Sequence, residues 1–205
     1  MIRIACFGDS NTYGYDPRMG SFGRYPDSVR WTGRLNALAG VSVRNHGING
    51  AEIPLNGVYV SEVYQVEKPD VIILMFGSND VLERVLCAER TGTGGEPGEA
   101  ASRVAARMER YVSNILDLLG GSGGPEIILI APPAMSPGTW TDPAVISEMK
   151  RLAPLYREIA KSFELRFLDA SSWPLELCFD GVHLTEEGHR VFYEKIKVAL
   201  AQSTA

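Results

Sequence analysis

Residues 7–14 read Phe7-Gly8-Asp9-Ser10-Asn11-Thr12-Tyr13-Gly14 and follow an apolar run, residues 2–7, that contains a single arginine. The run is typical of a short buried strand, and a glycine, an acid and a serine come directly after it. In open α/β sheets, ligands and catalytic groups lie at the carboxyl ends of the strands. Ser10 is therefore a candidate nucleophile, with the next helix supplying backbone N–H donors. The alternative is a helix-capping hydroxyl, because serine is common at the N-cap.

Four further segments have strand patterns. Residues 41–46 alternate, whereas residues 71–76 and 127–131 are continuous apolar runs of the kind that is covered on both faces. Residues 166–169 form the last short strand. Strands of this kind separated by helices predict a parallel sheet with helices on both faces. We therefore expect an α/β fold, a three-layer α/β/α sandwich around a five-stranded parallel sheet.

Helical spacing of apolar residues, or a helix-start signal, occurs between these strands. The expected helices cover residues 31–39, the mixed segment 51–67, residues 102–119, a long segment that opens at Asp142-Pro143, and a terminal segment after Thr185. Residues 88–98, AERTGTGGEPG, carry little pattern and are expected to form a mobile loop.

Length and composition limit the class of protein. A chain of 205 residues is expected to be one domain, residues 1–205, that needs no disulfide or metal. A net charge of −5 argues against a nucleic-acid partner, and no apolar run is long enough for a membrane span. The first strand begins at Ile2, which leaves no room for a signal peptide. Three scattered cysteines without a CxxC spacing favour a cytoplasmic setting and argue against a zinc site.

Asp180-Gly181-Val182-His183 is the second informative stretch. A serine hydroxyl needs a base to take its proton, and the imidazole in turn needs a carboxylate on its other nitrogen. Asp180 and His183 could meet both needs from one tight turn. The alternative is an exposed loop histidine beside a turn aspartate. Of the other two histidines, His46 at a strand end is expected to be a structural hydrogen-bonder, and His189 a surface or helix-packing residue.

Two further turns at strand ends offer groups that could hold a developing oxyanion. Gly50 could bring a backbone N–H close to a ligand, and Asn79 could donate from its side chain. Both residues are also ordinary turn formers, which is the alternative for each. The GxSxG match around Ser122 follows a helix and precedes a strand, the reverse of a nucleophile elbow, so Ser122 is rejected as a nucleophile.

Taken together, four blocks resemble, in order and spacing, those of the SGNH hydrolases, also called GDSL lipases/esterases, which have a flavodoxin-like fold. The blocks are Gly8-Asp9-Ser10, Gly50, Gly77-x-Asn79-Asp80 and Asp180-x-x-His183. The resemblance implies that Ser10 is the nucleophile and that Asp180 and His183 complete a catalytic triad. It also implies an oxyanion hole formed by the N–H groups of Ser10 and Gly50 and by the side chain of Asn79.

A finer resemblance is to the aryl esterase/acyltransferase branch, through residues 6–10, Arg30-Trp31-Thr32-Gly33 and Pro132-Pro133. Asn11 is a departure, because the eponymous motif has leucine there. We expect it to alter local polarity without removing a catalytic group, and Asp9 to anchor the turn. Members of the branch act on short acyl esters, and some form oligomers through inserted loops. Residues 88–98 are thus a candidate contact or lid in a homo-oligomer.

The expected function is that of a serine esterase, which hydrolyses short-chain acetyl or aryl esters through an acyl-enzyme on Ser10. A small-molecule ester is the expected partner, and no cofactor or metal is implied. Two alternatives stay open: an acyltransferase that uses the same triad, and a non-catalytic ligand-binding module. Trp140 and Met135 are candidates for the acyl pocket, with core or loop packing as the alternative for each.

Overall fold

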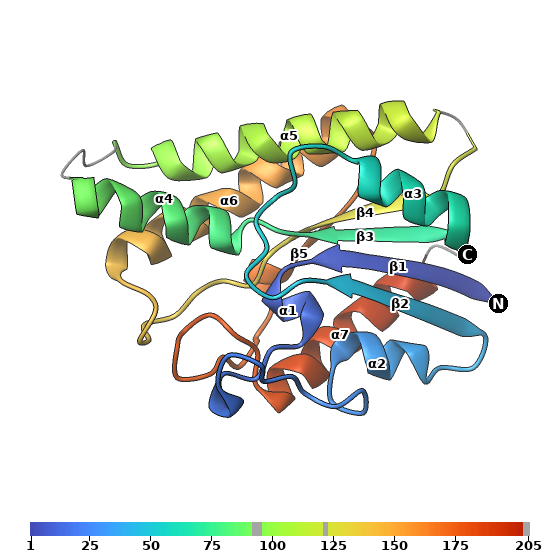
Figure 1. Ribbon diagram of the computed structural model, residues 1–205, viewed down its shortest axis with the longest axis horizontal. Coiled ribbons are helices and arrows are strands. Elements are labelled where there is room, and N and C mark those ends of the chain that lie inside the picture. The colour runs from blue at the N-terminus through green and yellow to red at the C-terminus, as the bar shows by residue number, and fades with distance from the viewer. Residues whose placement is uncertain (92–95, 121–122, 203–205) are drawn as a thin grey trace.

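The protein is described from a computed structural model that covers residues 1–91, 96–120 and 123–202. Its centre is a sheet of five parallel strands in the order β2-β1-β3-β4-β5 (Figure 1). The strands are β1 Ile2–Gly8, β2 Val41–Gly47, β3 Val71–Met75, β4 Glu126–Ala131 and β5 Arg166–Asp169. The predicted fold class, a three-layer α/β/α sandwich around a five-stranded parallel sheet, is confirmed.

Helices cover both faces of the sheet. They are α1 Ser10–Tyr13, α2 Trp31–Asn36, α3 Val58–Glu67, α4 Ser78–Thr91, α5 Glu99–Leu119, α6 Pro143–Ser162 and α7 Glu186–Ala201, with 3-10 helices at Pro17–Met19 and Ala170–Ser172. The first layer contains α3, α4, α5 and α6, and the second contains α2 and α7 (Figure 1).

Two hydrophobic clusters hold the three layers together. In β1, Ala5 and Phe7 enter the cluster under the α3–α6 layer, whereas Ile4 and Cys6 enter the cluster under α2 and α7. This division follows from the pleat, which turns successive side chains to opposite faces. Both faces of the strand are therefore apolar, as expected for a central parallel strand, and each large apolar side chain removed from water contributes roughly 1.5–3 kcal/mol.

The sheet order places the Ser10 turn at a topological switch point. The chain passes from β1 to β2 on one side and returns to β3 on the other side of β1. Gly8 at the end of β1 pairs with Gly47 and with Met75, so the three strands end at the same level. Polar turns that follow these strands must therefore meet at one edge of the sheet, which is the usual place of a ligand site.

The prediction for residues 88–98 was wrong in part. Residues 88–91 belong to α4, a helix that the sequence pattern did not predict, and Gly98 is the N-cap of α5. The physical reason is packing, because Val81 and Val85, one turn apart on α4, are buried in the first cluster. Residues 92–95 of this segment lie outside the described residues, and its role as a contact or lid stays a prediction.

Other boundaries differ by a few residues. In the segment 51–67 only Val58–Glu67 is helical, and α5 begins at Glu99 rather than at residue 102. The earlier start of α5 has a cause outside the helix: the buried Glu148 carboxylate accepts the backbone N–H groups of Gly98 and Ala101, at 2.5 and 2.9 Å. A carboxylate at a helix N-terminus satisfies free donors and complements the helix dipole.

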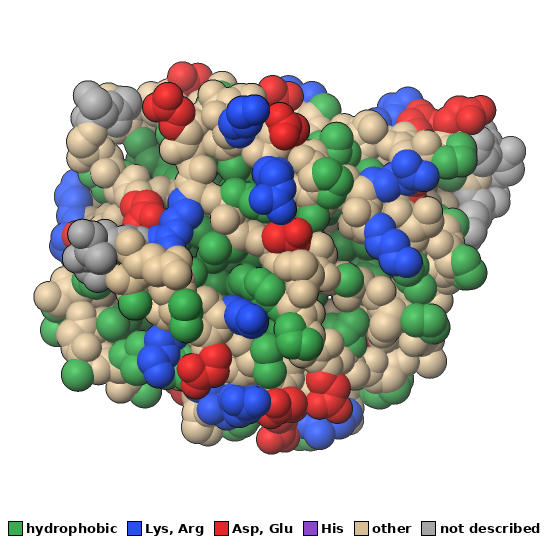
Figure 2. Space-filling view, turned by 180° about the vertical axis from the view of Figure 1, so that it is seen from behind, with side chains coloured by type: hydrophobic (Ala, Val, Ile, Leu, Met, Phe, Trp, Pro, Cys, Tyr) green, Lys and Arg blue, Asp and Glu red, His purple; other side chains and the backbone are tan. Residues whose placement is uncertain are grey.

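The surface opposite to the view of Figure 1 has no separation of charge: basic and acidic side chains are interspersed across it (Figure 2). Within the described ranges, no helix combines the length and the apolar character that a membrane crossing needs.

Candidate active site

Ser10 opens α1 directly after β1. Asp9 is the N-cap, and its Oδ1 accepts the backbone N–H of Asn11 at 3.0 Å. The turn is tight at Gly8, where a Cβ would collide with the Thr12 side chain and the Met75 carbonyl oxygen. Only glycine fits this close approach of β1, α1 and β3. The local sequence therefore fixes where the Ser10 hydroxyl stands.

His183 and Asp180 lie on a turn between the last strand and α7. Asp180 Oδ1 accepts the backbone N–H groups of Val182 and His183, at 2.9 and 3.0 Å, and its Oδ2 lies 2.7 Å from His183 Nδ1. Burial acts to raise the pKa of the Asp180 carboxyl, but the hydrogen bonds from His183 and Val182 outweigh it and hold that pKa below its ordinary value. Asp180 is thus a buried carboxylate that stays ionised.

The two turns meet although they are 173 residues apart in the chain. His183 Nε2 lies 2.9 Å from Ser10 Oγ, and all three side chains are buried. Because the Asp180 carboxylate can only accept, Nδ1 carries the ring proton of the neutral imidazole, and Nε2 is the acceptor for the Ser10 hydroxyl. The arrangement is a hydroxyl, a base and an orienting carboxylate in a row, which is the geometry of an activated nucleophile.

Gly50 and Asn79 lie on the two neighbouring turns. Asn79 Nδ2 donates to the Ala51 carbonyl oxygen at 2.8 Å, which joins the β3 turn to the Gly50 turn. The Ile48 N–H donates to the Gly8 carbonyl oxygen at 3.0 Å, which joins the Gly50 turn to the end of β1, where the Ser10 turn begins. Gly50 has φ +76° and open space where a Cβ would stand, so its requirement for glycine comes from the backbone conformation and not from crowding.

Two aromatic rings flank the His183 imidazole. Tyr15 is buried and meets the imidazole edge-on with ring centroids 4.7 Å apart, and Trp140 does so at 5.2 Å. Trp140 is 49% exposed, so one part of its indole faces solvent beside the candidate site. Met135, in contrast, is buried in the first hydrophobic cluster. Of the two expected pocket residues, the structure therefore places only Trp140 against His183.

The other histidines have structural contacts. His46 bonds the Tyr59 hydroxyl through Nδ1 and Glu67 through Nε2, at 2.9 and 3.1 Å, and stacks on Phe7. His189 is fully buried in α7, and burial lowers its pKa to about 3, so that it stays neutral. Ser122, rejected on its sequence context, lies outside the described residues.

Buried acids stand behind the turns. Burial raises the pKa of Asp9 to about 6, against the N–H donor of Asn11. Asp80 is also buried, which raises its pKa, while the Ile53 N–H and Arg107 act in the opposite direction. Arg107 Nη1 lies 3.0 Å from Asp80 Oδ1 and 2.5 Å from Glu52 Oε2. These two ion pairs tie α5 to the residues that follow Gly50 and Asn79.

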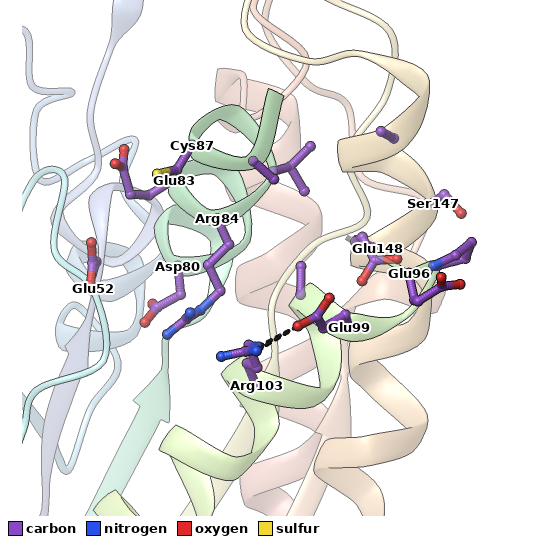
Figure 3. A pocket seen from close by; sticks show the side chains of 15 residues that line it. Glu52, Asp80, Glu83, Arg84, Cys87, Glu96, Glu99, Arg103, Ser147 and Glu148 are labelled. Carbon is purple, nitrogen blue, oxygen red and sulfur yellow. Dashed lines mark hydrogen bonds and ion pairs between the residues drawn. The ribbon is translucent and has the colours of Figure 1, made fainter. Parts of the chain in front are cut away.

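A cavity of about 760 Å³ opens between α4, α5 and α6 (Figure 3). Its wall includes Glu52 and Asp80, and the triad candidates are not among its described lining residues. Most of its labelled side chains are charged, and Glu99 and Arg103 pair across one turn of α5. The cavity is therefore beside the triad candidates rather than at them. Across the described part of the chain, no cluster of three or more His, Cys, Asp or Glu side chains suits a metal ion.

Sequence reasoning missed three residues that shape this site. Asn11 was noted only as a departure from leucine, and neither Tyr15 nor Arg107 was singled out. Asn11 carried a usable signal, because an amide that directly follows a buried strand and a candidate nucleophile needs polar partners. Tyr15 and Arg107 carried none, since their contacts involve distant segments.

A known family shares the sequence pattern behind this geometry. The family described as GDSL-like Lipase/Acylhydrolase matches residues 6–191. The comparison with curated proteins returned no match.

Solved structures of similar fold cover almost the whole chain. A carbohydrate acetylesterase family member from Sinorhizobium meliloti has a TM-score of 0.79 at 24% identity, covering 98% of each chain. The native aryl esterase of M. smegmatis has a TM-score of 0.73 at 24% identity, covering 97% of this chain and 99% of that one. A catalytic mutant of an acetylxylan esterase from Geobacillus stearothermophilus has a TM-score of 0.63 at 22% identity, covering 95% and 92%.

Proposed function

The chain belongs to the GDSL-like lipase/acylhydrolase family and is a carboxylic ester hydrolase, and from that premise we propose that it cleaves short-chain acetyl and aryl esters through an acyl-enzyme on Ser10. One observation carries the proposal: His183 bonds Ser10 Oγ through Nε2 and Asp180 through Nδ1, at 2.9 and 2.7 Å. A hydroxyl held by a base that is itself held by a carboxylate has a path for its proton.

Acylation starts when Ser10 Oγ attacks the ester carbonyl carbon. His183 Nε2 takes the hydroxyl proton as the carbon–oxygen bond forms, and the ring becomes an imidazolium. The Asp180 carboxylate, kept ionised by its hydrogen bonds, stabilises that cation across the Nδ1–H bond. Negative charge builds up at the same time on the former carbonyl oxygen.

The donors for this oxygen are the N–H groups of Ser10 and Gly50 and the side chain of Asn79. A primary amide has two N–H donors, and the bond to Ala51 uses one of them, so the other is held in a fixed direction. Each donor aimed at a developing oxyanion is worth about 2.7–4 kcal/mol. The hydrogen bonds that join the three turns support this assignment, since they keep the donors in place before the substrate arrives.

Trp140 supports an aryl leaving group. The imidazolium must protonate the leaving oxygen, so the alcohol portion of the ester lies on the His183 side of the tetrahedral intermediate. The partly exposed indole of Trp140 adjoins the imidazole there. An aromatic leaving group packed against the indole gains roughly 0.5–1.5 kcal/mol beyond the burial of its area.

Deacylation repeats these steps with water. His183 Nε2 removes a proton from the water, the oxygen attacks the acyl carbon, and the Ser10 oxygen leaves with the proton. An alcohol in place of water would make the same residues an acyltransferase. Product analysis with added alcohol separates the two, because only the transferase yields a new ester in dilute aqueous solution.

Covalent labelling tests the proposal directly. An organophosphonate should react with the purified protein once per chain, and peptide mass spectrometry should find the adduct on Ser10. The same sample should lose its activity on p-nitrophenyl acetate in proportion to labelling. An adduct on another residue, or full activity after complete labelling of Ser10, would contradict the mechanism. A non-catalytic binding module would give no adduct.

A further inference from the structure

The Asn11 side chain brackets His183. Asn11 is 3% exposed; its Nδ2 donates to the Val182 carbonyl oxygen at 3.1 Å and its Oδ1 accepts the Leu184 N–H at 3.0 Å. Those two groups belong to the residues on either side of His183. One amide therefore fixes the backbone before and after the imidazole, as a partner strand does with a residue of a sheet.

This bracket is the main polar link between two distant parts of the chain. Within the described residues, hydrogen bonds between residues 9–14 and 180–185 comprise the two made by Asn11 and the one between Ser10 and His183. The remaining bonds that hold His183 come from its own segment, from Asp180 and from the Cys178 N–H. They shape that turn but do not place it against Ser10.

Asn11 is itself held in place. Its N–H bonds Asp9 Oδ1 at 3.0 Å, and its carbonyl oxygen accepts the Trp31 indole N–H at 3.0 Å. The side chain is therefore a short rigid link from the residue next to Ser10 to both neighbours of His183. A leucine, which stands here in the eponymous motif, has no polar atom and would leave the Val182 carbonyl and the Leu184 N–H without these partners.

We propose that Asn11 is a positioning residue that sets the His183 imidazole within hydrogen-bonding distance of Ser10 Oγ by locking the backbone on both sides of His183. The proposal rests on the proposed function. Asn11 touches neither the ester nor the transferred proton, and it acts only through the place of the base.

Asn11→Leu is the first test, because it keeps the number and branching of the side-chain heavy atoms and removes both bonds. Loss of the bracket lets the imidazole move, and a displacement of about 1 Å costs up to about 100-fold in rate. We expect kcat on p-nitrophenyl acetate to fall about 10- to 100-fold while KM stays within about twofold. Should this variant not fold, Asn11→Ser, which removes the bracket without apolar bulk, carries the same expectation.

Asn45→Ala is the matched control. The Asn45 amide also holds the α1 turn, because its Nδ2 donates to the Thr12 carbonyl oxygen at 2.7 Å, but it makes no bond to the His183 segment. We expect this variant to lose thermal stability while its kcat stays within about threefold of the wild-type value. An equal fall in kcat for Asn45→Ala would overturn the proposal, since any weakening of α1 would then suffice.

A double-mutant cycle with His183→Ala gives the decisive readout. If Asn11 acts through the base alone, Asn11→Leu changes the residual rate of His183→Ala by less than about twofold. A further fall of tenfold or more would show that Asn11 supports Ser10 or the oxyanion donors instead. Full activity of His183→Ala would overturn the proposed function itself. A slow His183→Ala beside a fully active, folded Asn11→Leu would overturn only the role of Asn11.

Discussion

The Nδ2 atom of Asn79 donates a hydrogen bond to the carbonyl oxygen of Ala51 at 2.8 Å. That bond joins the first turn of α4 to the residue that follows Gly50, so the two candidate oxyanion donors from different strands form one unit. The second N–H of the Asn79 amide is held in a fixed direction as a result.

Asn79→Ala should therefore lower kcat by about 100- to 1,000-fold with little change in KM, because the lost donor acts mainly in the transition state. The measurement is steady-state hydrolysis of p-nitrophenyl acetate. Asn114→Ala is the control: Asn114 Oδ1 accepts the Gly57 N–H at 2.7 Å, away from the site. A wild-type kcat for Asn79→Ala would show that the Asn79 side chain is not an oxyanion donor.

Ser10→Ala should abolish the acyl-enzyme and lower kcat by several orders of magnitude, on the order of 10⁶-fold for removal of a triad nucleophile. Circular dichroism should be unchanged, because the hydroxyl is a small part of a turn already fixed by Gly8 and Asp9. Ser122→Ala, at the rejected GxSxG match, should keep full activity and full labelling by the phosphonate. If Ser10→Ala kept its activity and labelling while Ser122→Ala lost both, Ser10 would not be the nucleophile.

Asp180→Ala should lower kcat less than Ser10→Ala does. Its remaining kcat should be about 100-fold higher, because a triad that lacks only its carboxylate keeps part of its catalysis. The same substitution removes the acceptor for the Val182 and His183 N–H groups. Asp180→Asn keeps an acceptor oxygen in the turn and separates that structural loss from the loss of charge. A rate equal to the wild type in both variants would show that the carboxylate has no part in the reaction.

Trp140→Ala should change selectivity between leaving groups. Removal of the indole beside His183 should raise KM for phenyl acetate by about 2- to 10-fold, the equivalent of roughly 0.5–1.5 kcal/mol, and leave KM for ethyl acetate nearly unchanged. The ratio of kcat/KM for the two esters is the readout. Met135→Leu, in the buried core, serves as the control and should leave that ratio unaltered. An equal loss on both esters would mean that the indole does not contact the leaving group.

His189→Phe should make the free energy of unfolding depend less on pH below about pH 6.5. Burial lowers the folded-state pKa of His189 to about 3, below the unfolded value near 6.5. As the pH falls, His189 therefore takes up a proton in the unfolded chain before it does so in the folded chain. The stabilising contribution is present above about pH 6.5 and is lost as the pH falls toward 3, by at most about 1.4 kcal/mol per pH unit.

Urea unfolding at pH 7.5 and 4.5 measures the effect for both proteins. The free energy of unfolding should fall less between these pH values in His189→Phe than in the wild type. The substitution also suits the surroundings, since the imidazole packs edge-on to Tyr25 with centroids 5.2 Å apart and both of its nitrogens lack partners among the described residues. An identical fall in both proteins would show that His189 does not titrate on unfolding.

Local patterns in the sequence were enough to determine the layers and the edge of the sheet that carries the polar turns. Residues 71–76 and 127–131 are uniformly apolar because their strands are covered on both faces, and the order of strands and helices then forces a parallel sheet. Parallel strands end at one edge, so Ser10, Gly50 and Asn79 could be expected to gather there. Helix α4 was missed, since its pattern merges with the polar segment 88–98.

The tertiary structure alone decided how the two ends of the chain meet. Asn11 and Val182 are 171 residues apart, and the sequence around either residue gives no indication that the two form a hydrogen bond. The same holds for Tyr15 and Trp140, which reach His183 from two separate loops. Periodicity reports which face of an element is buried, because that depends on neighbours within one or two turns. The partners of a buried polar side chain depend on how whole elements dock, and only the folded chain specifies them.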